Sequence, residues 1–88
     1  MILARVIGTV VSTRKDEALI GFKLLIVEAE DPRDGLDAER LVAVDTVGAG
    51  IGEVVLVARG GAARATLPVI APTDATIVGI VDTVDLCK

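Results

Sequence analysis

The sequence contains no histidine, tryptophan or tyrosine, and it has one phenylalanine, Phe22, and one cysteine, Cys87. Without histidine, acid–base or metal chemistry would have to rest on carboxylates, lysine and arginine alone. Asp45 and Asp82, which lie within apolar segments, are the candidates for such chemistry. So small a catalytic inventory favours a protein that is not an enzyme and that holds neither a metal nor a cofactor.

Positive charge and aromatic surface are also scarce. The formal net charge is −4 and the isoelectric point is near 4.6, whereas a nucleic-acid partner favours a basic face. Proteins that bind single strands also use aromatic side chains to stack bases, and Phe22 is the only one here. A single cysteine excludes an internal disulfide, which fits a reducing compartment.

Long apolar runs are absent, although the chain as a whole is apolar. No run approaches the roughly 18–20 residues of a spanning helix, and Arg5 interrupts any signal-peptide core, so we expect no membrane partner. Yet 52% of the residues are hydrophobic and the mean hydropathy is +0.68. One small domain cannot hide so many aliphatic side chains, and the surplus predicts self-association.

Runs rich in β-branched residues alternate with turn-forming segments. Strands are expected at residues 1–13, 20–30, 40–47, 53–59 and 75–86. The connections are expected to be a charged turn at 14–19, a hairpin loop at 31–39, a glycine-rich loop at 48–52, a short helical turn at 60–66 and a short extended piece at 67–71.

This order of elements predicts an all-β fold: a small five-stranded OB-like barrel with one short helical turn, forming a single domain over residues 1–88. Gly8 and Gly79, in the middle of strands, predict bulges or sharp bends. Residues 24–27 and 54–58 are almost continuously apolar, which predicts burial on both faces. Since the barrel interior takes only one face, a neighbouring subunit would cover the other.

The glycine-rich loop has three possible interpretations. A dinucleotide fingerprint needs G-x-G-x-x-G followed by a helix, but here G-x-G-x-G precedes a strand-like run, and the lysine of a phosphate-binding loop is missing. A second interpretation is a tight hairpin loop with positive φ at several positions. The third is that small residues let the backbones of symmetry-related subunits crowd around an axis.

Two groups of charged residues also stand out. The carboxylates in 31–39 could bind calcium, but their spacing misses the EF-hand pattern and better fits a solvated hairpin tip. Aspartates also lie in or beside apolar strands, among them Asp45 and Asp74, and these would pair with arginine or cap backbone donors at subunit contacts. Arg64 is the natural partner for one of them.

Five segments together carry a family resemblance: residues 1–13 (MILARVIGTVVST), 21–27 (GFKLLIV), 43–57 (AVDTVGAGIGEVVLV), 60–64 (GGAAR) and 72–82 (PTDATIVGIVD). In this order, over essentially the whole chain, they resemble the EutN/CcmL family of bacterial microcompartment vertex proteins. One departure is Gly61, at a position where the family often has serine.

The resemblance implies a structural protein: a homopentamer that closes the fivefold vertices of a microcompartment shell in the bacterial cytoplasm, beside hexameric shell proteins. It places the glycine-rich loop, with Gly48, Ala49, Gly50, Ile51 and Gly52, near a fivefold axis with a narrow opening. Contacts that fix the subunit interface are assigned to Asp45, Arg64 and Asp74.

Two other classes of protein stay open from the sequence alone. One is an OB-fold binding module for nucleic acid or another ligand, and the other is a small acidic enzyme that uses Asp45 or Asp82. If the vertex hypothesis holds, Gly50→Glu should damage the pentamer through crowding at the axis and through strain at positive φ.

Overall fold

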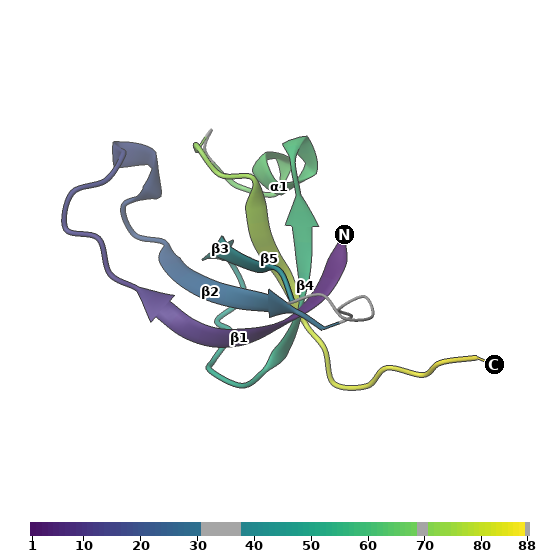
Figure 1. Ribbon diagram of the computed structural model, residues 1–88. Coiled ribbons are helices and arrows are strands. Elements are labelled where there is room, and N and C mark those ends of the chain that lie inside the picture. The colour runs from purple at the N-terminus through teal and green to yellow at the C-terminus, as the bar shows by residue number, and fades with distance from the viewer. Residues whose placement is uncertain (31–37, 69–70, 88) are drawn as a thin grey trace.

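Five strands and two short helices lie within residues 1–30, 38–68 and 71–87, which the computed structural model describes (Figure 1). In chain order they are β1 (Ile2–Val10), the 3-10 helix η1 (Glu17–Leu19), β2 (Lys23–Ala29), β3 (Arg40–Asp45), β4 (Val54–Arg59), α1 (Gly61–Ala65) and β5 (Ala75–Ile80). The predicted hairpin loop at 31–39 lies largely outside the described residues.

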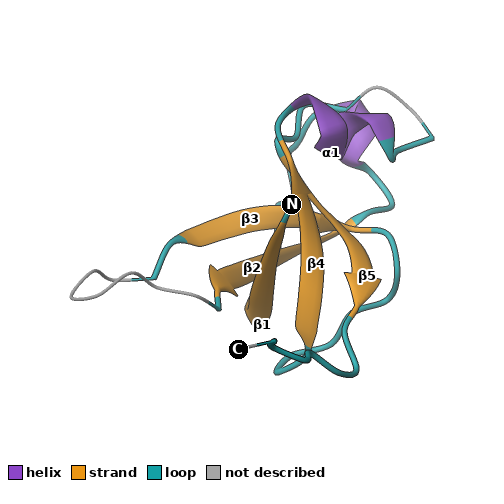
Figure 2. Cartoon of the chain, turned by 90° about the vertical axis from the view of Figure 1, so that its right-hand side faces the viewer, coloured by secondary structure: helices purple, strands orange, loops and turns teal. Residues whose placement is uncertain are grey.

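The strands close into a barrel in the order β1-β2-β3-β5-β4 (Figure 2). Every neighbouring pair is antiparallel except β3 and β5, which run parallel and share only two register pairs, Val44 with Thr76 and Asp45 with Ile77. The short helix α1 connects β4 to β5 at one end of the barrel. The predicted five-stranded barrel with one short helical turn is therefore confirmed.

Aliphatic side chains that alternate along the strands fill the barrel. Leu25, Val27, Val55, Val57 and Ile77 are all at most 2% exposed. Their neighbours in sequence, such as Leu24, Ile26 and Leu56, are only half-buried in a single chain. The outward-facing apolar side chains therefore remain partly open to contact, which is the surplus that the composition predicts.

The two glycines within strands lie next to irregularities in the register. The pairing of β1 with β2 shifts between Val6 and Gly8, and the pairing of β4 with β5 shifts where Leu56 faces Gly79. A Cβ atom at Gly8 would lie 3.4 Å from Cδ1 of Ile26, so the missing side chain lets the strands approach closely. The predicted bulges are confirmed.

Four expected boundaries were wrong by two residues or more. Strand β1 ends at Val10 rather than at residue 13, and β2 begins at Lys23 rather than at residue 20. Strand β3 ends at Asp45 rather than at residue 47, and β5 ends at Ile80 rather than at residue 86. The helix η1 replaces part of the predicted charged turn, and the Asp16 carboxylate caps it by accepting from the N–H of Ala18. The extended piece expected at 67–71 is not a strand in its described residues, and 69–70 lie outside them.

Candidate functional site

Residues 48–52, here called the glycine loop, connect β3 to β4 at the end of the barrel opposite α1 (Figure 1). Gly48 and Gly52 have φ of +80° and +89°, values that other residues rarely adopt. The expected positive φ therefore occurs at two positions of the loop, but the expected hairpin is wrong, because β3 and β4 are not neighbours in the barrel. Gly50 does not have positive φ, so the strain expected from Gly50→Glu was wrongly assigned, because the loop reverses its direction at its two ends.

The first half of the loop is held by Asp45, the last residue of β3. Its Oδ1 accepts from the N–H of Val47 at 3.1 Å and its Oδ2 accepts from the N–H of Ala49 at 3.0 Å. The Lys23 ammonium lies 3.9 Å from Oδ2 and also donates to the carbonyl of Ala49 at 3.2 Å. Asp45 is 8% exposed, so a charged group with two backbone donors fixes the loop from inside the chain.

The second half is held by residues on both sides of the loop. The Glu53 carboxylate accepts from the N–H of Gly50 at 2.6 Å, and the N–H of Glu53 donates back to the Gly50 carbonyl at 3.2 Å. The Arg5 guanidinium donates to the carbonyl of Gly52 at 2.7 Å, while the N–H of Gly52 donates to Val6 at 2.8 Å. The loop is thus tied to β1 and to itself.

The five loop residues differ in what they present to the surface. The Ala49 side chain is 1% exposed and belongs to the core cluster, so it offers no side chain to a symmetry axis. Ile51 is 63% exposed although it is apolar. The solvent-facing part of the predicted axis segment is therefore the Ile51 side chain together with the small surfaces of Gly48 and Gly52.

Arg64 and Asp74 lie away from the glycine loop, near α1. Arg64, in α1, donates to the carbonyl of Thr73 at 3.2 Å, and the N–H of Gly60 donates to the carbonyl of Asp74 at 2.8 Å. Among the described residues Arg64 forms no ion pair with a carboxylate. The structure therefore brings Arg64 and Asp74 to one end of the barrel and Asp45 to a buried position within the chain, and their interface roles remain predictions.

Sequence reasoning missed Lys23, Glu53 and Arg5, the long side chains that complete the loop. Each belongs to or borders a strand next to the loop in the barrel. Lys23 lies directly opposite Asp45 in the register of β2 and β3. This opposition is the one signal that could have predicted Lys23 as part of the site. Opposite charges directly across an antiparallel pair are a recurring stabilising arrangement.

Within the part of the chain that the structure describes, no group of three or more metal-binding side chains comes together. Over the same residues no helix is long and apolar enough to span a membrane. Cys87 is a free, exposed cysteine. The site consists of the backbone groups of the glycine loop and the charged side chains that bind them, and this arrangement fixes the conformation of the loop.

A small closed barrel with an ordered glycine loop and open apolar faces defines a structural, self-associating protein. A family model described as ethanolamine utilisation protein EutN/carboxysome matches residues 1–82. The chain therefore belongs to the EutN/CcmL family, which confirms the resemblance found in the sequence.

Similar proteins have closely related names. The chain is 51% identical to the bacterial microcompartment shell vertex protein GrpN of Rhodospirillum rubrum, with 97% of each chain covered. It is 53% identical to the carboxysome shell vertex protein CcmL of Synechocystis, with 100% of this chain and 89% of the relative covered. The solved structure of GrpN, a pentameric microcompartment shell protein, covers both chains completely at 49% identity and a TM-score of 0.82.

Proposed function

We propose that five copies of this chain form a ring that occupies the fivefold vertices of a bacterial microcompartment shell, within the bacterial cytoplasm and in contact with hexameric shell proteins. The observation that carries the proposal is the match over the full length to a pentameric shell protein at 49% identity. The relatives are named for their place in a shell, so we assign a structural role and no enzymatic one. The same names favour this function over an OB-fold module that binds nucleic acid.

The surface of the single subunit supports assembly. Outward-facing aliphatic side chains on several strands remain open, including Ile7 at 39%, Val42 at 52% and Ile80 at 37% exposure. Contacts between different patches of identical subunits give a closed ring when the rotation between them closes. A sheet of hexagonal tiles needs points of lower rotational order to close, and a ring of five supplies them.

Within this ring we place the glycine loop beside the fivefold axis, with Ile51 as its exposed side chain. The positive φ at Gly48 and Gly52 supports this placement, because the loop turns tightly without a Cβ at either end. We place Arg64 and Asp74 at contacts between subunits, since both are exposed in the single chain. Asp45 acts on the interface indirectly, through the loop that it orders.

The mass of the assembly tests the proposal. Native mass spectrometry and light scattering at micromolar concentration are expected to give five times the subunit mass of 9.1 kDa. The composition favours a stable ring because exposed aliphatic surface is covered on assembly. A monomer across the whole concentration range would contradict the proposal, and so would a ring of six.

Replacing Arg64 with alanine is expected to weaken the ring more than it weakens the subunit. The guanidinium is exposed and, among the described residues, donates one hydrogen bond, to the carbonyl of Thr73, so its loss should cost the isolated subunit less than about 1 kcal/mol. Thermal unfolding followed by circular dichroism, at a concentration where rings dissociate, measures the subunit, and mass spectrometry measures the ring. Equal losses in both would place Arg64 in the fold rather than at a contact.

A further inference from the structure

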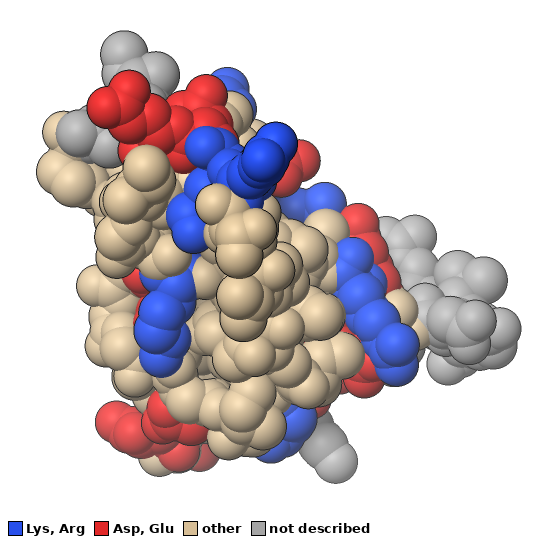
Figure 3. Space-filling view, turned by 90° about the vertical axis from the view of Figure 1, so that its left-hand side faces the viewer, with Lys and Arg blue, Asp and Glu red and all other residues tan. Residues whose placement is uncertain are grey.

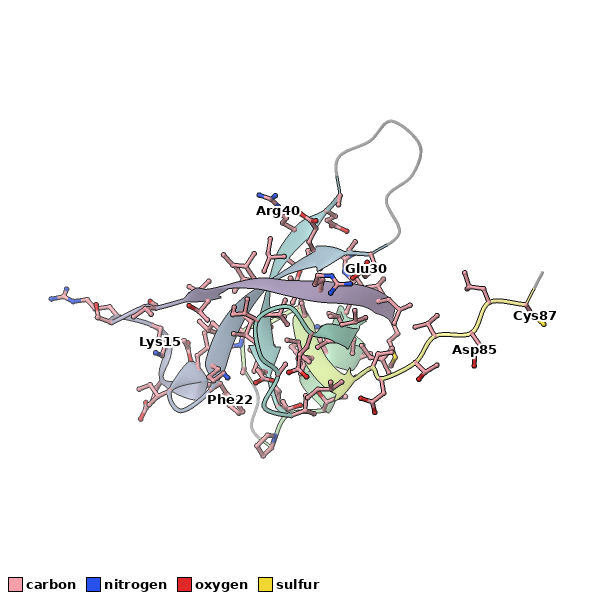
Figure 4. The ribbon with its side chains drawn as sticks, turned by 90° about the horizontal axis from the view of Figure 1, so that it is seen from below. Lys15, Phe22, Glu30, Arg40, Asp85 and Cys87 are labelled. Carbon is pink, nitrogen blue, oxygen red and sulfur yellow. The ribbon has the colours of Figure 1, made fainter. Side chains whose placement is uncertain are left out.

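The chain leaves the barrel after β5 as an extended C-terminal tail, residues 81–87 (Figures 1 and 4). Its last backbone hydrogen bond to the barrel runs from the N–H of Val81 to the carbonyl of Val54 at 2.8 Å. Val54 is the first residue of β4, so the partner strand ends where the tail begins. The tail thus continues beyond β5, and among the described residues no strand pairs with it.

The tail alternates polar and apolar residues over 83–86, as a half-buried strand does, and Asp82 would share the face of Val84 and Leu86 in a fully extended chain. Val84 and Leu86, two residues apart, would lie on one face of an extended chain, with Thr83 and Asp85 on the other. Val84 is 49% exposed and Leu86 is 83% exposed, so in a single chain the apolar face is largely uncovered. Apolar alternation with free backbone groups is typical of a segment that adds to a sheet edge.

A sheet edge of suitable length is present at the other end of the molecule. The register of β1 with β4 ends at Arg5, and Val6 adds two further backbone hydrogen bonds, to Glu53 and Gly52. The register of β1 with β2 continues to Val10. Among the described residues, 7–10 therefore have a strand partner on one side only, and Val11, which follows, is 88% exposed.

The tail and this edge differ in charge as well as in position. Residues 81–87 carry Asp82 and Asp85 and are followed by Lys88, whereas Arg14 and Lys15 follow the edge directly and precede Asp16 and Glu17. Figure 4 shows Lys15 at one end of the molecule and Asp85 and Cys87 at the opposite end. In Figure 3, which shows the side of the molecule that lies at the left of Figure 1, Lys and Arg surround a broad surface that carries no charged residue. In the described part of the chain, no ion pair within 4 Å is formed by Arg14, by Lys15 or by either tail aspartate.

We propose that the tail of one subunit adds as a β-strand to residues 7–10 of the next subunit in the ring. This inference rests on the proposed pentamer and specifies one of its contacts. The tail and the strand edge at 7–10 lie at opposite ends of one subunit, so pairing between them is a head-to-tail contact. Contacts of this type generate rings. A tail of seven residues spans about 23 Å at 3.3 Å per residue, which is longer than the four-residue edge.

The competing location of the tail is its own barrel. A shallow cleft lies between the tail and the barrel wall, lined by Leu3, Arg5, Glu30, Val54, Val84 and Leu86. If the tail folded back there, Val84 and Leu86 would cover Leu3 and Val54 of the same chain. The experiments below separate this arrangement from exchange between subunits.

Disulfide trapping tests which chain the tail contacts. Cys87 is the natural thiol of the tail, and a second cysteine is introduced at either end of the edge, as Ile7→Cys or Val11→Cys. Under mild oxidation at least one variant is expected to give covalent oligomers of up to five subunits on non-reducing gels. Adding Cys87→Ser should abolish them, and Ala62→Cys, exposed on α1, is the matched control. Oligomers no more abundant than in the control, from both variants, would overturn the inference.

Charge substitution on the apolar face of the tail tests its contribution to the ring. The double variant Val84→Asp Leu86→Asp is expected to raise the concentration at which rings dissociate at least tenfold. Thr83→Asp, which adds a charge to the opposite face, should change it less than threefold. If the double variant assembles like the wild type, tail exchange is wrong while the pentamer stands; if the wild type forms no pentamer, the proposed function fails first.

Discussion

Replacing Asp45 with alanine is expected to lower the free energy of unfolding of the subunit by about 2–3 kcal/mol. The N–H of Ala49, a residue that is 1% exposed, would lose its acceptor and remain buried. A buried donor without a partner costs about 1–3 kcal/mol, and the Lys23 ammonium would lose its neighbouring carboxylate as well. Urea unfolding followed by circular dichroism measures the change, since the chain has neither tryptophan nor tyrosine for fluorescence.

Asp74→Ala is the matched control for this change. Asp74 is exposed, and the hydrogen bond that it accepts from Gly60 uses its backbone carbonyl, which alanine retains. Its effect on subunit stability should stay within about 0.5 kcal/mol. Asp45→Asn should fall between the two, because the amide keeps one acceptor and turns a donor toward the second N–H. Equal unfolding midpoints for Asp45→Ala and Asp74→Ala would show that the carboxylate does not hold the loop.

Replacing Ile51 with glutamate is expected to prevent ring formation at low salt while leaving the subunit folded. Ile51 is 63% exposed, so a charge there is solvated in the single chain. In the proposed ring five carboxylates would be brought together near one axis. Two like charges 4 Å apart repel by about 4 kcal/mol near a protein surface. We expect the dissociation concentration of the ring to rise at least tenfold, as measured by native mass spectrometry and light scattering.

Salt and a neutral variant make the test of Ile51 specific. Ile51→Gln has a side chain of similar length without the charge and should assemble nearly as the wild type does. Raising the ionic strength to 1 M shortens the screening length to about 3 Å and should restore rings of Ile51→Glu. Gly50→Glu is a less direct test, because a Cβ at Gly50 would lie 3.3 Å from the Glu53 carboxylate in the same chain. Stable rings of Ile51→Glu at low salt would move the glycine loop away from the axis.

The sequence predicted the number and order of the strands because apolar alternation and turn residues are local signals. It could not predict where pairing stops. Apolar residues continue after β5 at Val81, Val84 and Leu86, and only the end of β4 at Val54 shows that they lie beyond the barrel. At β1, the apolar run continues past Val10, whereas the register with β2 ends there.

The loop could be predicted in part. Its glycines indicated a tight turn, but the pattern alone does not say that Gly48 and Gly52, rather than Gly50, take positive φ. Asp45, three residues before the loop, was assigned to subunit contacts, yet its carboxylate accepts hydrogen bonds within its own chain from Val47 and Ala49. Which donors a carboxylate meets depends on how the backbone turns after it.

The parallel pairing of β3 with β5 is the contact that closes the barrel. Without it, the chain is an antiparallel ribbon, β3-β2-β1-β4-β5, and two register pairs join the ends of that ribbon. The entropy of closing the intervening loop has to be offset here by the contacts of two register pairs. Asp45 belongs to this joint through its register pair with Ile77, and it also accepts hydrogen bonds from Val47 and Ala49, so one residue serves both the closure of the barrel and the order of the glycine loop.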